Sequence, residues 1–233
     1  MNKDKIIAGK IYHILNRGTD KRKIFLDEKD YLRFIHDLFE FNDENQAFNI
    51  GHFFNKEYID VRRQYIENRK KRKLLVEILA FCLMPNHYHL LLKPKKDSGV
   101  SEFIKKINGG YAKYFNNRYQ RTGTLFQGKY KSILIKQDAH LIHLPYYIHL
   151  NPLDLKFPEW RNRELKNYKA AMKFLENYRW SSFPDYIGKK NFPSITQREF
   201  LKDFFEGTKN YKKEMEKFLK ELDIDEIKDL TLE

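Results

Sequence analysis

The sequence contains almost no cysteine and no long apolar run. A single cysteine, Cys82, excludes an internal disulfide framework and any zinc site built from several cysteines. No stretch approaches the roughly 18 consecutive apolar residues that a membrane-spanning helix needs. The opening residues, MNKDKIIAGKIYHIL, lack the apolar core of a signal peptide. We therefore expect a cytoplasmic protein that does not enter a membrane.

Acidic residues are scarce relative to basic ones. The 233 residues include 45 Lys or Arg against 32 Asp or Glu, a formal net charge of +13. Such an excess favours a polyanionic partner, nucleic acid first, although a purely solubilising surface is the alternative. Aromatic residues make up 15% of the chain and supply rings that can stack on unpaired bases. The length fits one compact domain with additions, or two small domains.

Hydrophobic periodicity predicts the order of the secondary structure. Strands are expected at 10–16, 75–84, 87–93 and 129–136, and helices at 28–41, 100–118 and 138–150. This order is the split βαββαβ pattern of a ferredoxin-like sandwich, an α+β fold with an antiparallel sheet and helices on one face. Further helical stretches are expected near 163–177, 196–206 and 208–222.

One expected helix contains glycines, and one further segment is strongly basic. The helix at 100–118 is expected to begin at a Ser101 cap, and Gly109-Gly110 inside it weakens its helical pattern. Residues 61–73, VRRQYIENRKKRK, hold seven Arg or Lys and suggest an exposed helical arm.

His87-Tyr88-His89 is the sharpest local feature. Alternate residues of a strand point to the same face, so both imidazoles are expected to project together. Two neutral imidazoles on one rigid strand can hold a divalent metal ion, with a third ligand supplied from elsewhere. The alternative is two unrelated histidines of the surface or core.

Tyr147 and Asn151 lie four residues apart on an expected helix, so their side chains share one face. An activated tyrosine hydroxyl can attack phosphorus, and an amide oxygen can complete the shell of a hard metal ion. Taken alone, Tyr147 is better explained as a core aromatic, because apolar neighbours form a stripe on the same helix. His143 and His149 are expected in backbone contacts or at the surface.

Three basic segments are candidates for contact with nucleic acid. Residues 121–132, RTGTLFQGKYKS, combine basic side chains, glycines and aromatics, which suits phosphate contact and base stacking. The loop after the first strand is similar, and the arm at 61–73 is expected to contact phosphates with little sequence specificity or to be a solvated face. The candidate side chains are Arg17, Arg62, Arg63, Lys70, Lys71, Arg72, Arg121, Phe126, Lys129, Tyr130 and Lys131.

Five segments together resemble the REP-associated tyrosine transposases, a branch of the single-tyrosine HUH transposases of insertion sequences. They are YHILNRG at 12–18, AFCLMPNHYHLLL at 80–92, YFNNRYQRTGTLFQGKYKS at 114–132, YIHLNP at 147–152 and YRWSSFPDYIG at 178–188. Each segment is weak evidence by itself, whereas five in the family's order are specific.

The resemblance implies a ferredoxin-like enzyme that cleaves and joins single-stranded DNA folded into hairpins, either repeated extragenic palindromes or transposon ends. His87 and His89 match the family's metal-binding histidines, Tyr147 matches its nucleophile, and Asn151 lies where relatives complete the metal shell. The implied cofactor is Mg²⁺ or Mn²⁺, and the implied intermediate is a 5′-phosphotyrosine. Such a protein is expected to be bacterial, nucleoid-associated, and a monomer or homodimer.

Two departures from the family pattern bear on this expectation. The stretch 43–73 is longer than the usual link and is expected to be an added basic insertion. After YIHLNP, Leu153-Asp154-Leu155 stands where many relatives have Val-Arg-Ala, which weakens any expected basic contact there. The expected division is a catalytic domain at 1–155 and a helical C-terminal extension at 156–233.

Competing interpretations remain at this point. Tyr146 precedes Tyr147, but the residue four positions after Tyr147 is Asn151, whereas that after Tyr146 is Leu150, so Tyr147 is the expected nucleophile.

A non-catalytic module of the same fold that binds DNA or RNA hairpins would need the basic and aromatic residues alone. A zinc hydrolase is disfavoured, because no Glu stands beside the histidine pair as a general base.

Overall fold

A computed structural model describes residues 5–45, 72–136, 138–199, 201, 205 and 207–221, without the side chains of 138–140 and 209. The elements that position the site are β1 (Tyr12–Arg17), α1 (Glu28–Glu40), β2 (Val76–Met84), β3 (His87–Pro94), α3 (Gly99–Arg118), β4 (Lys131–Leu134), α4 (Asp138–Leu150), η4 (Asn151–Leu155), η5 (Pro158–Asn162), α5 (Tyr168–Asn177), α6 (Phe183–Tyr186) and α8 (Thr208–Glu221).

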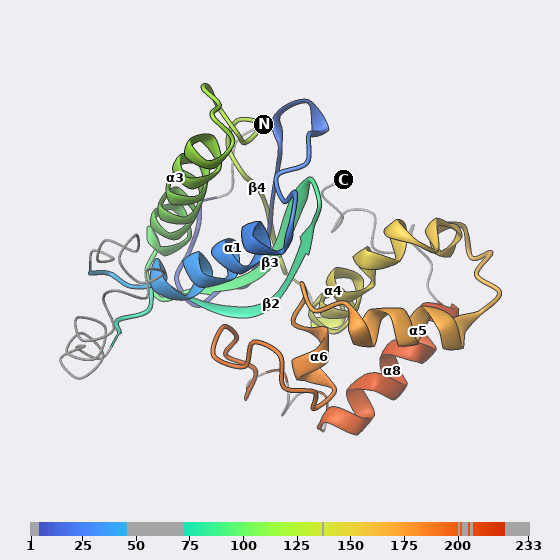
Figure 1. Ribbon diagram of the computed structural model, residues 1–233. Coiled ribbons are helices and arrows are strands. Elements are labelled where there is room, and N and C mark those ends of the chain that lie inside the picture. The colour runs from blue at the N-terminus through green and yellow to red at the C-terminus, as the bar shows by residue number, and fades with distance from the viewer. Residues whose placement is uncertain are drawn as a thin grey trace.

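The four strands form one antiparallel sheet in the order β2-β3-β1-β4. This order, with α1 and α3 as the two crossovers, is the split βαββαβ arrangement expected from the sequence (Figure 1). The register places Leu15 opposite His89 and Arg17 opposite His87 across β1 and β3. The predicted α+β fold with an antiparallel sheet is confirmed.

The boundaries of several elements differ from the sequence-based expectation. The helix expected at 100–118 begins at Gly99, with Ser98 rather than Ser101 at its N-cap. The stretch expected as a helix at 163–177 contains α5 from Tyr168, preceded by the 3₁₀ helix η5. Most of 43–73 lies outside the described residues, as do 200, 202–204 and 206 of the helix expected at 196–206, whose first three residues, 196–198, are not helical.

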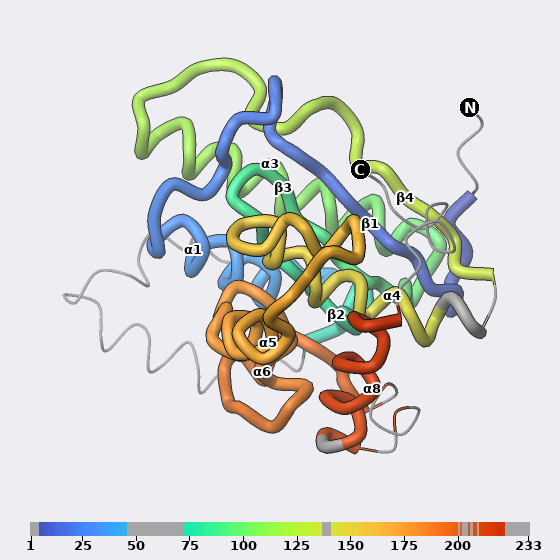
Figure 2. Tube along the Cα trace, turned by 90° about the vertical axis from the view of Figure 1, so that its right-hand side faces the viewer, coloured from blue at the N-terminus to red at the C-terminus, as the bar shows by residue number. Residues whose placement is uncertain are grey.

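Both faces of the sheet are covered, which corrects the expectation of helices on one face. Tyr12, Ile14 and Phe81 belong to a core shared with α1 and α3, whereas Cys82 and Leu91 belong to a second core shared with α4. In the turned view of Figure 2, α5, α6 and α8 lie in front of the sheet. The physical reason is visible in β2 and β3, whose residues are nearly all buried, because strands that are apolar on both faces need two covering layers.

The second core brings the C-terminal helices into contact with α4. Leu144 of α4, Met172 of α5 and Met215 of α8 are all buried in it. Pro145 lies inside α4 without ending the helix. Within the described part of the chain, no helix is long and apolar enough to cross a membrane.

Adjacent glycines in α3 offer a matched test of this packing. A methyl group added at Gly110 would overlap the ring of Phe41, whereas one added at Gly109 would meet nothing within 4 Å. We expect Gly110→Ala to lower the free energy of unfolding by about 1–3 kcal/mol through overpacking. Gly109→Ala is expected to raise it by about 1 kcal/mol through helix propensity. Urea unfolding measures both, and equal effects of the two substitutions would contradict the described packing.

Candidate active site

His87 and His89 open β3 and lie on the face of the sheet that α4 covers. Their ring centroids are 4.9 Å apart, and His89 is completely buried. Nδ1 of His87 lies 2.6 Å from Oδ1 of Asn86, and since an amide oxygen only accepts, Nδ1 is the donor and Nε2 is the ring nitrogen that Asn86 does not engage. The two imidazoles therefore project together, as expected for alternate residues of a strand.

A third histidine, His13 of β1, joins them and was missed by sequence reasoning. Its Nε2 lies 2.9 Å from Nδ1 of His89, and the two rings stack with centroids 5.1 Å apart. Tyr12 and Ile14, its neighbours on β1, face the opposite core. The available signal was the alternation of this strand, which places His13 on the same face as Leu15 and Arg17.

Tyr147 of α4 faces these histidines. Its ring centroid lies 6.2 Å from that of His89 and 6.4 Å from that of His13, edge to face in both cases. The residue is fully buried. Tyr146 points elsewhere, into an aromatic cluster with Phe205 and Tyr211, because consecutive helical residues are turned by about 100°. The geometry thus favours Tyr147 over Tyr146 as the residue beside the histidines.

Asn151 begins η4, one turn beyond Tyr147, and is buried. Its Nδ2 donates to the carbonyl oxygen of Tyr147 at 2.8 Å. Its Oδ1 accepts from Nη2 of Arg161 at 3.2 Å. The orientation of the amide is therefore fixed by a donor on one side and an acceptor on the other.

Arg161 is a second residue that sequence reasoning missed. Its Nε and Nη2 donate to the two carboxylate oxygens of Asp154 at 2.8 and 2.6 Å. Its Nη1 lies 3.5 Å from the hydroxyl oxygen of Tyr147, at the outer limit of a hydrogen bond. Asp154, which weakened the expectation of a basic contact after YIHLNP, anchors a basic side chain that comes from η5. Only the tertiary structure places a guanidinium beside Tyr147.

His149 is buried in the core, which corrects the expectation of a surface residue or a backbone contact. Nδ1 lies 2.6 Å from the hydroxyl of Tyr211 on α8, and Nε2 lies 2.7 Å from Oγ of Ser182. Burial lowers the pKa of His149 to about 3, so the ring is neutral near pH 7. Ser182 in turn bonds the backbone of Phe81 in β2. His149 thus connects α4 to both α8 and the sheet.

The donors present suit a divalent ion in type. No group of three or more His, Cys, Asp or Glu side chains in the described ranges is arranged to hold a metal. The set expected from the sequence has only two such side chains, His87 and His89, together with the amide of Asn151. The hydrogen bond at Nδ1 of His87 leaves Nε2 as its ligating nitrogen, an arrangement common among metal-binding histidines.

Two of the basic segments meet at the end of the sheet that carries His87. Arg17 donates from Nε to Oε1 of Gln127 at 2.6 Å, and its carbonyl accepts from N of Gln127 at 2.8 Å. Gly18 and Phe126 form an isolated bridge between the same two loops. Since Arg17 also stands opposite His87 in the sheet, a strand bound along these loops would pass close to the histidines.

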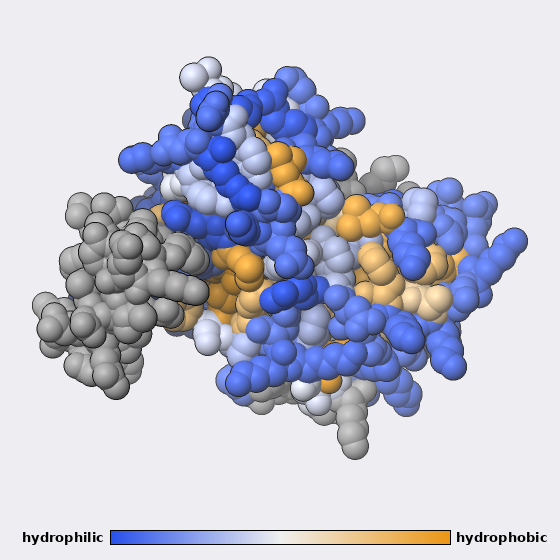
Figure 3. Space-filling view, viewed as in Figure 1, coloured by the Kyte–Doolittle hydropathy of each residue, from blue (hydrophilic) through white to orange (hydrophobic). Residues whose placement is uncertain are grey.

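The other predicted nucleic-acid residues differ in their exposure and contacts. Lys129 and Lys131 are exposed, and Tyr130 is half-buried with its hydroxyl 3.1 Å from Oγ of Ser101. Arg121 lies over the ring of Phe115 at 5.7 Å. Hydrophilic residues dominate the face seen in Figure 3, both over α3 and over α5. The four candidates outside the described residues are Arg62, Arg63, Lys70 and Lys71.

Phe126 and Arg72 differ from their expected roles. Phe126 is only 8% exposed, and its ring packs against Tyr88 and Tyr111 in the core. A packing role thus replaces the base stacking expected for it. Arg72 folds onto α1, where Nη1 donates to the carbonyl of Phe39 at 2.6 Å and the guanidinium covers its ring.

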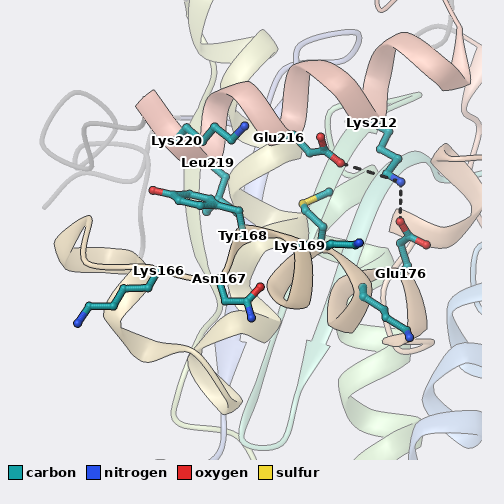
Figure 4. Close-up of a pocket in the computed structure, with 11 residues that line it drawn as sticks. Lys166, Asn167, Tyr168, Lys169, Glu176, Lys212, Glu216, Leu219 and Lys220 are labelled. Atoms are coloured by element: carbon teal, nitrogen blue, oxygen red, sulfur yellow. Dashed lines mark ion pairs between the residues drawn. The ribbon is translucent and has the colours of Figure 1, made fainter.

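A basic groove lies between α5 and α8 (Figure 4). It has a volume of about 680 Å³ and is lined by five lysines and two glutamates among other residues. Lys212 is paired with both glutamates, at 2.8 Å from Glu176 and 4.0 Å from Glu216. The groove contains neither a histidine nor Tyr147, so the candidate active site remains the buried face between β3, β1 and α4.

A family model matches the chain, and two solved structures are similar to it. The model of the family described as "Transposase IS200 like" matches residues 9–151. Among solved structures, the chain is similar to a REP-associated tyrosine transposase bound to a REP hairpin, with 16% identity, a TM-score of 0.47, and coverage of 84% of this chain and 89% of that one. It is also similar to a protein of Deinococcus radiodurans R1 assigned as a transposase, with 17% identity, a TM-score of 0.33, and coverage of 63% and 95%. No curated protein matches the chain.

The connection through His149 yields a stability prediction. Tyr211→Phe removes the hydroxyl beside Nδ1 of His149 and is expected to lower the free energy of unfolding by about 1–3 kcal/mol, because a buried ring nitrogen loses its partner. Tyr168→Phe, at the half-exposed edge of α5, is the matched control and is expected to change it by less than about 0.5 kcal/mol. Chemical denaturation compares the two variants. An unchanged free energy of unfolding for Tyr211→Phe would show that this hydrogen bond does not stabilise the position of α4.

Proposed function

Because this chain belongs to the IS200-like transposase family, whose model matches residues 9–151, we propose that it cuts and rejoins single-stranded DNA through Tyr147. The observation that carries the proposal is the meeting of Tyr147 on α4 with His13 and His89 on the sheet. A tyrosine needed only for packing would require no imidazoles around its ring, since apolar side chains fill such a space at a lower desolvation cost.

The proposed metal ligands are Nε2 of His87, Nε2 of His89 and Oδ1 of Asn151. A divalent ion held there, Mg²⁺ or Mn²⁺, would supply a Lewis acid that polarises the scissile phosphate. For His89 to offer its Nε2 lone pair, its Nδ1–H must donate to Nε2 of His13, which lies 2.9 Å away. His13 would then be the residue that selects the tautomer of His89.

The proposed reaction is a transesterification at phosphorus. The hydroxyl oxygen of Tyr147 forms a bond to the phosphorus while the bond from phosphorus to the 3′-oxygen breaks. The proton of the tyrosine ends, through solvent, on the released 3′-hydroxyl. The product is a 5′-phosphotyrosine that keeps the energy of the phosphodiester, so a new 3′-hydroxyl can reverse the step without ATP.

The proposed partner is single-stranded DNA folded into hairpins, such as REP-like palindromes or transposon ends. The net charge of +13 supports a polyanion. The paired loops that carry Arg17 and Gln127 lie beside His87, and Lys129 and Lys131 follow along the same segment. These contacts are proposed to hold the strand through its phosphates.

One chain contains one set of the proposed catalytic residues, because Tyr147 meets the histidines of its own sheet. We propose that a monomer suffices for one cleavage, and that two cleavages occur in succession or in a homodimer. We also propose residues 1–155 as the catalytic domain and 156–233 as an extension that braces α4, since helices from both parts share the second core.

Replacing Tyr147 tests the proposal. Tyr147→Phe is expected to abolish a denaturation-resistant protein–DNA adduct on labelled hairpins from the DNA beside the gene, while hairpin affinity is kept, because only the hydroxyl is removed. The adduct of the unaltered protein should require Mg²⁺ or Mn²⁺ and be lost with EDTA. Tyr146→Phe is the matched control and should retain the adduct. Tight binding by the unaltered protein without any adduct would favour a non-catalytic hairpin-binding module instead.

The proposed phosphate contacts have their own test. Lys129→Ala and Lys131→Ala are each expected to reduce the slope of log affinity against log salt by about 0.7 on a single strand, because each removes one counterion-releasing contact. Lys213→Ala and Lys217→Ala, exposed on α8, should leave the slope unchanged. Fluorescence anisotropy at several salt concentrations measures the four slopes, and an equal change in all of them would argue against a path along 129–131.

A further inference from the structure

Arg161 stands at the centre of a set of contacts that the proposed mechanism does not yet use. It lies on η5, beyond the residues that match the family model. Its guanidinium is hydrogen-bonded to Asp154 and Asn151, and its Nη1 approaches the hydroxyl of Tyr147 at 3.5 Å. The guanidinium therefore touches both the proposed nucleophile and a proposed metal ligand.

The anchoring of Arg161 determines which of its atoms face the site. Asp154 accepts hydrogen bonds from Nε and Nη2 in a bidentate ion pair. This geometry holds a guanidinium most rigidly. Asp154 is itself held by Nε1 of Trp160 at 2.7 Å. The atom turned toward the Tyr147 oxygen is consequently Nη1. A cation on a rigid support is the arrangement that stabilises charge without reorganisation during reaction.

Arg161 is more exposed to solvent than its neighbours at the site. Its side chain is 26% exposed, whereas Tyr147 and Asn151 are fully buried. A phosphate that arrives from solvent would thus meet the Arg161 side chain before the buried Tyr147 hydroxyl. Arginine suits this task, since its planar fork can bind a carboxylate and a phosphate at once.

We propose that Arg161 is a further catalytic residue, which binds the scissile phosphate beside Tyr147 and stabilises its charge during both cleavage and joining. The inference rests on the proposed function of Tyr147. As the tyrosine oxygen bonds to phosphorus and the 3′-oxygen leaves, negative charge gathers on the non-bridging oxygens that Nη1 would contact. The reverse step passes through the same arrangement, so Arg161 serves both directions.

A purely structural role is the competing explanation. The Arg161–Asp154 pair could serve only to fasten η5 onto η4, in which case its removal would alter stability and leave chemistry unchanged. Because both side chains of the pair are partly exposed, such fastening is expected to contribute little. Rate and stability therefore separate the two roles.

The first experiment compares single-turnover cleavage and joining on a hairpin strand with saturating Mg²⁺ or Mn²⁺. Arg161→Ala is expected to slow both directions by about 100-fold or more, whereas hairpin affinity should fall by no more than about tenfold, the contribution of one phosphate contact. Arg161→Lys, which keeps the charge but not the fork, should recover part of the rate. Added ethylguanidinium should raise the rate of Arg161→Ala and not that of the unaltered protein. Arg163→Ala, exposed at the end of η5, is the matched control and should react normally.

The structural explanation would be upheld, and the proposal overturned, if Arg161→Ala and Arg161→Lys both reacted at the unaltered rate. The proposal is likewise overturned if a lower rate of Arg161→Ala tracked a lower melting temperature and was not rescued by ethylguanidinium or by lysine. Thermal unfolding of each variant supplies the comparison.

A second experiment does not depend on turnover. In a Tyr147→Phe background, a neutral methylphosphonate is moved one position at a time along the single strand beside the hairpin. With Arg161 present, one position is expected to weaken binding by about tenfold, and with Arg161→Ala that position should lose its effect. If no position depends on Arg161, the phosphate contact is refuted. If the unaltered protein forms no adduct at all, the proposed function of Tyr147 fails, while this measurement still decides whether Arg161 binds a phosphate.

Discussion

The burial of the second face of the sheet is the constraint on which the rest of the structure depends. β2 and β3 are almost entirely buried, so α4 and the helices after it must cover the face that α1 and α3 leave open. Covering that face packs α4 on β2 and β3. Tyr147 then meets His13 and His89, which lie far from it in the sequence. The candidate active site is a consequence of hydrophobic burial.

A site inside a core has to satisfy its polar groups, and here each partner also sets a direction. The hydrogen bond between the histidine rings orients His89, the carbonyl of Tyr147 orients Asn151, and Asp154 orients Arg161. Because unpaired buried polar groups are costly, these bonds hold the side chains in one arrangement. Rigid strands and a braced helix carry them, which is what a reaction sensitive to small displacements needs.

Specific elements show where sequence reasoning succeeded and where it failed. The strands at 76–84 and 87–94 and the helix at 138–150 were expected nearly as they occur. Apolar runs and the breaks at Pro85-Asn86 and Asn151-Pro152 are local signals. The base-stacking role predicted for Phe126 was wrong, because the basic, glycine-containing segment around it does not indicate that its ring packs against Tyr88. The surface position or backbone contact predicted for His149 was also wrong, because its partners Tyr211 and Ser182 are distant in sequence.

By itself the sequence determined the order of the elements, the common face of His87 and His89, and the spacing of Tyr147 and Asn151, because strand and helix periods are properties of the local backbone. Only the tertiary structure decided that helices cover both faces of the sheet, that His13 joins His89, and that Arg161 stands beside the Tyr147 hydroxyl. Those contacts join residues that are far apart in the sequence, where local periodicity gives no information. Packing and the pairing of buried polar groups determine them.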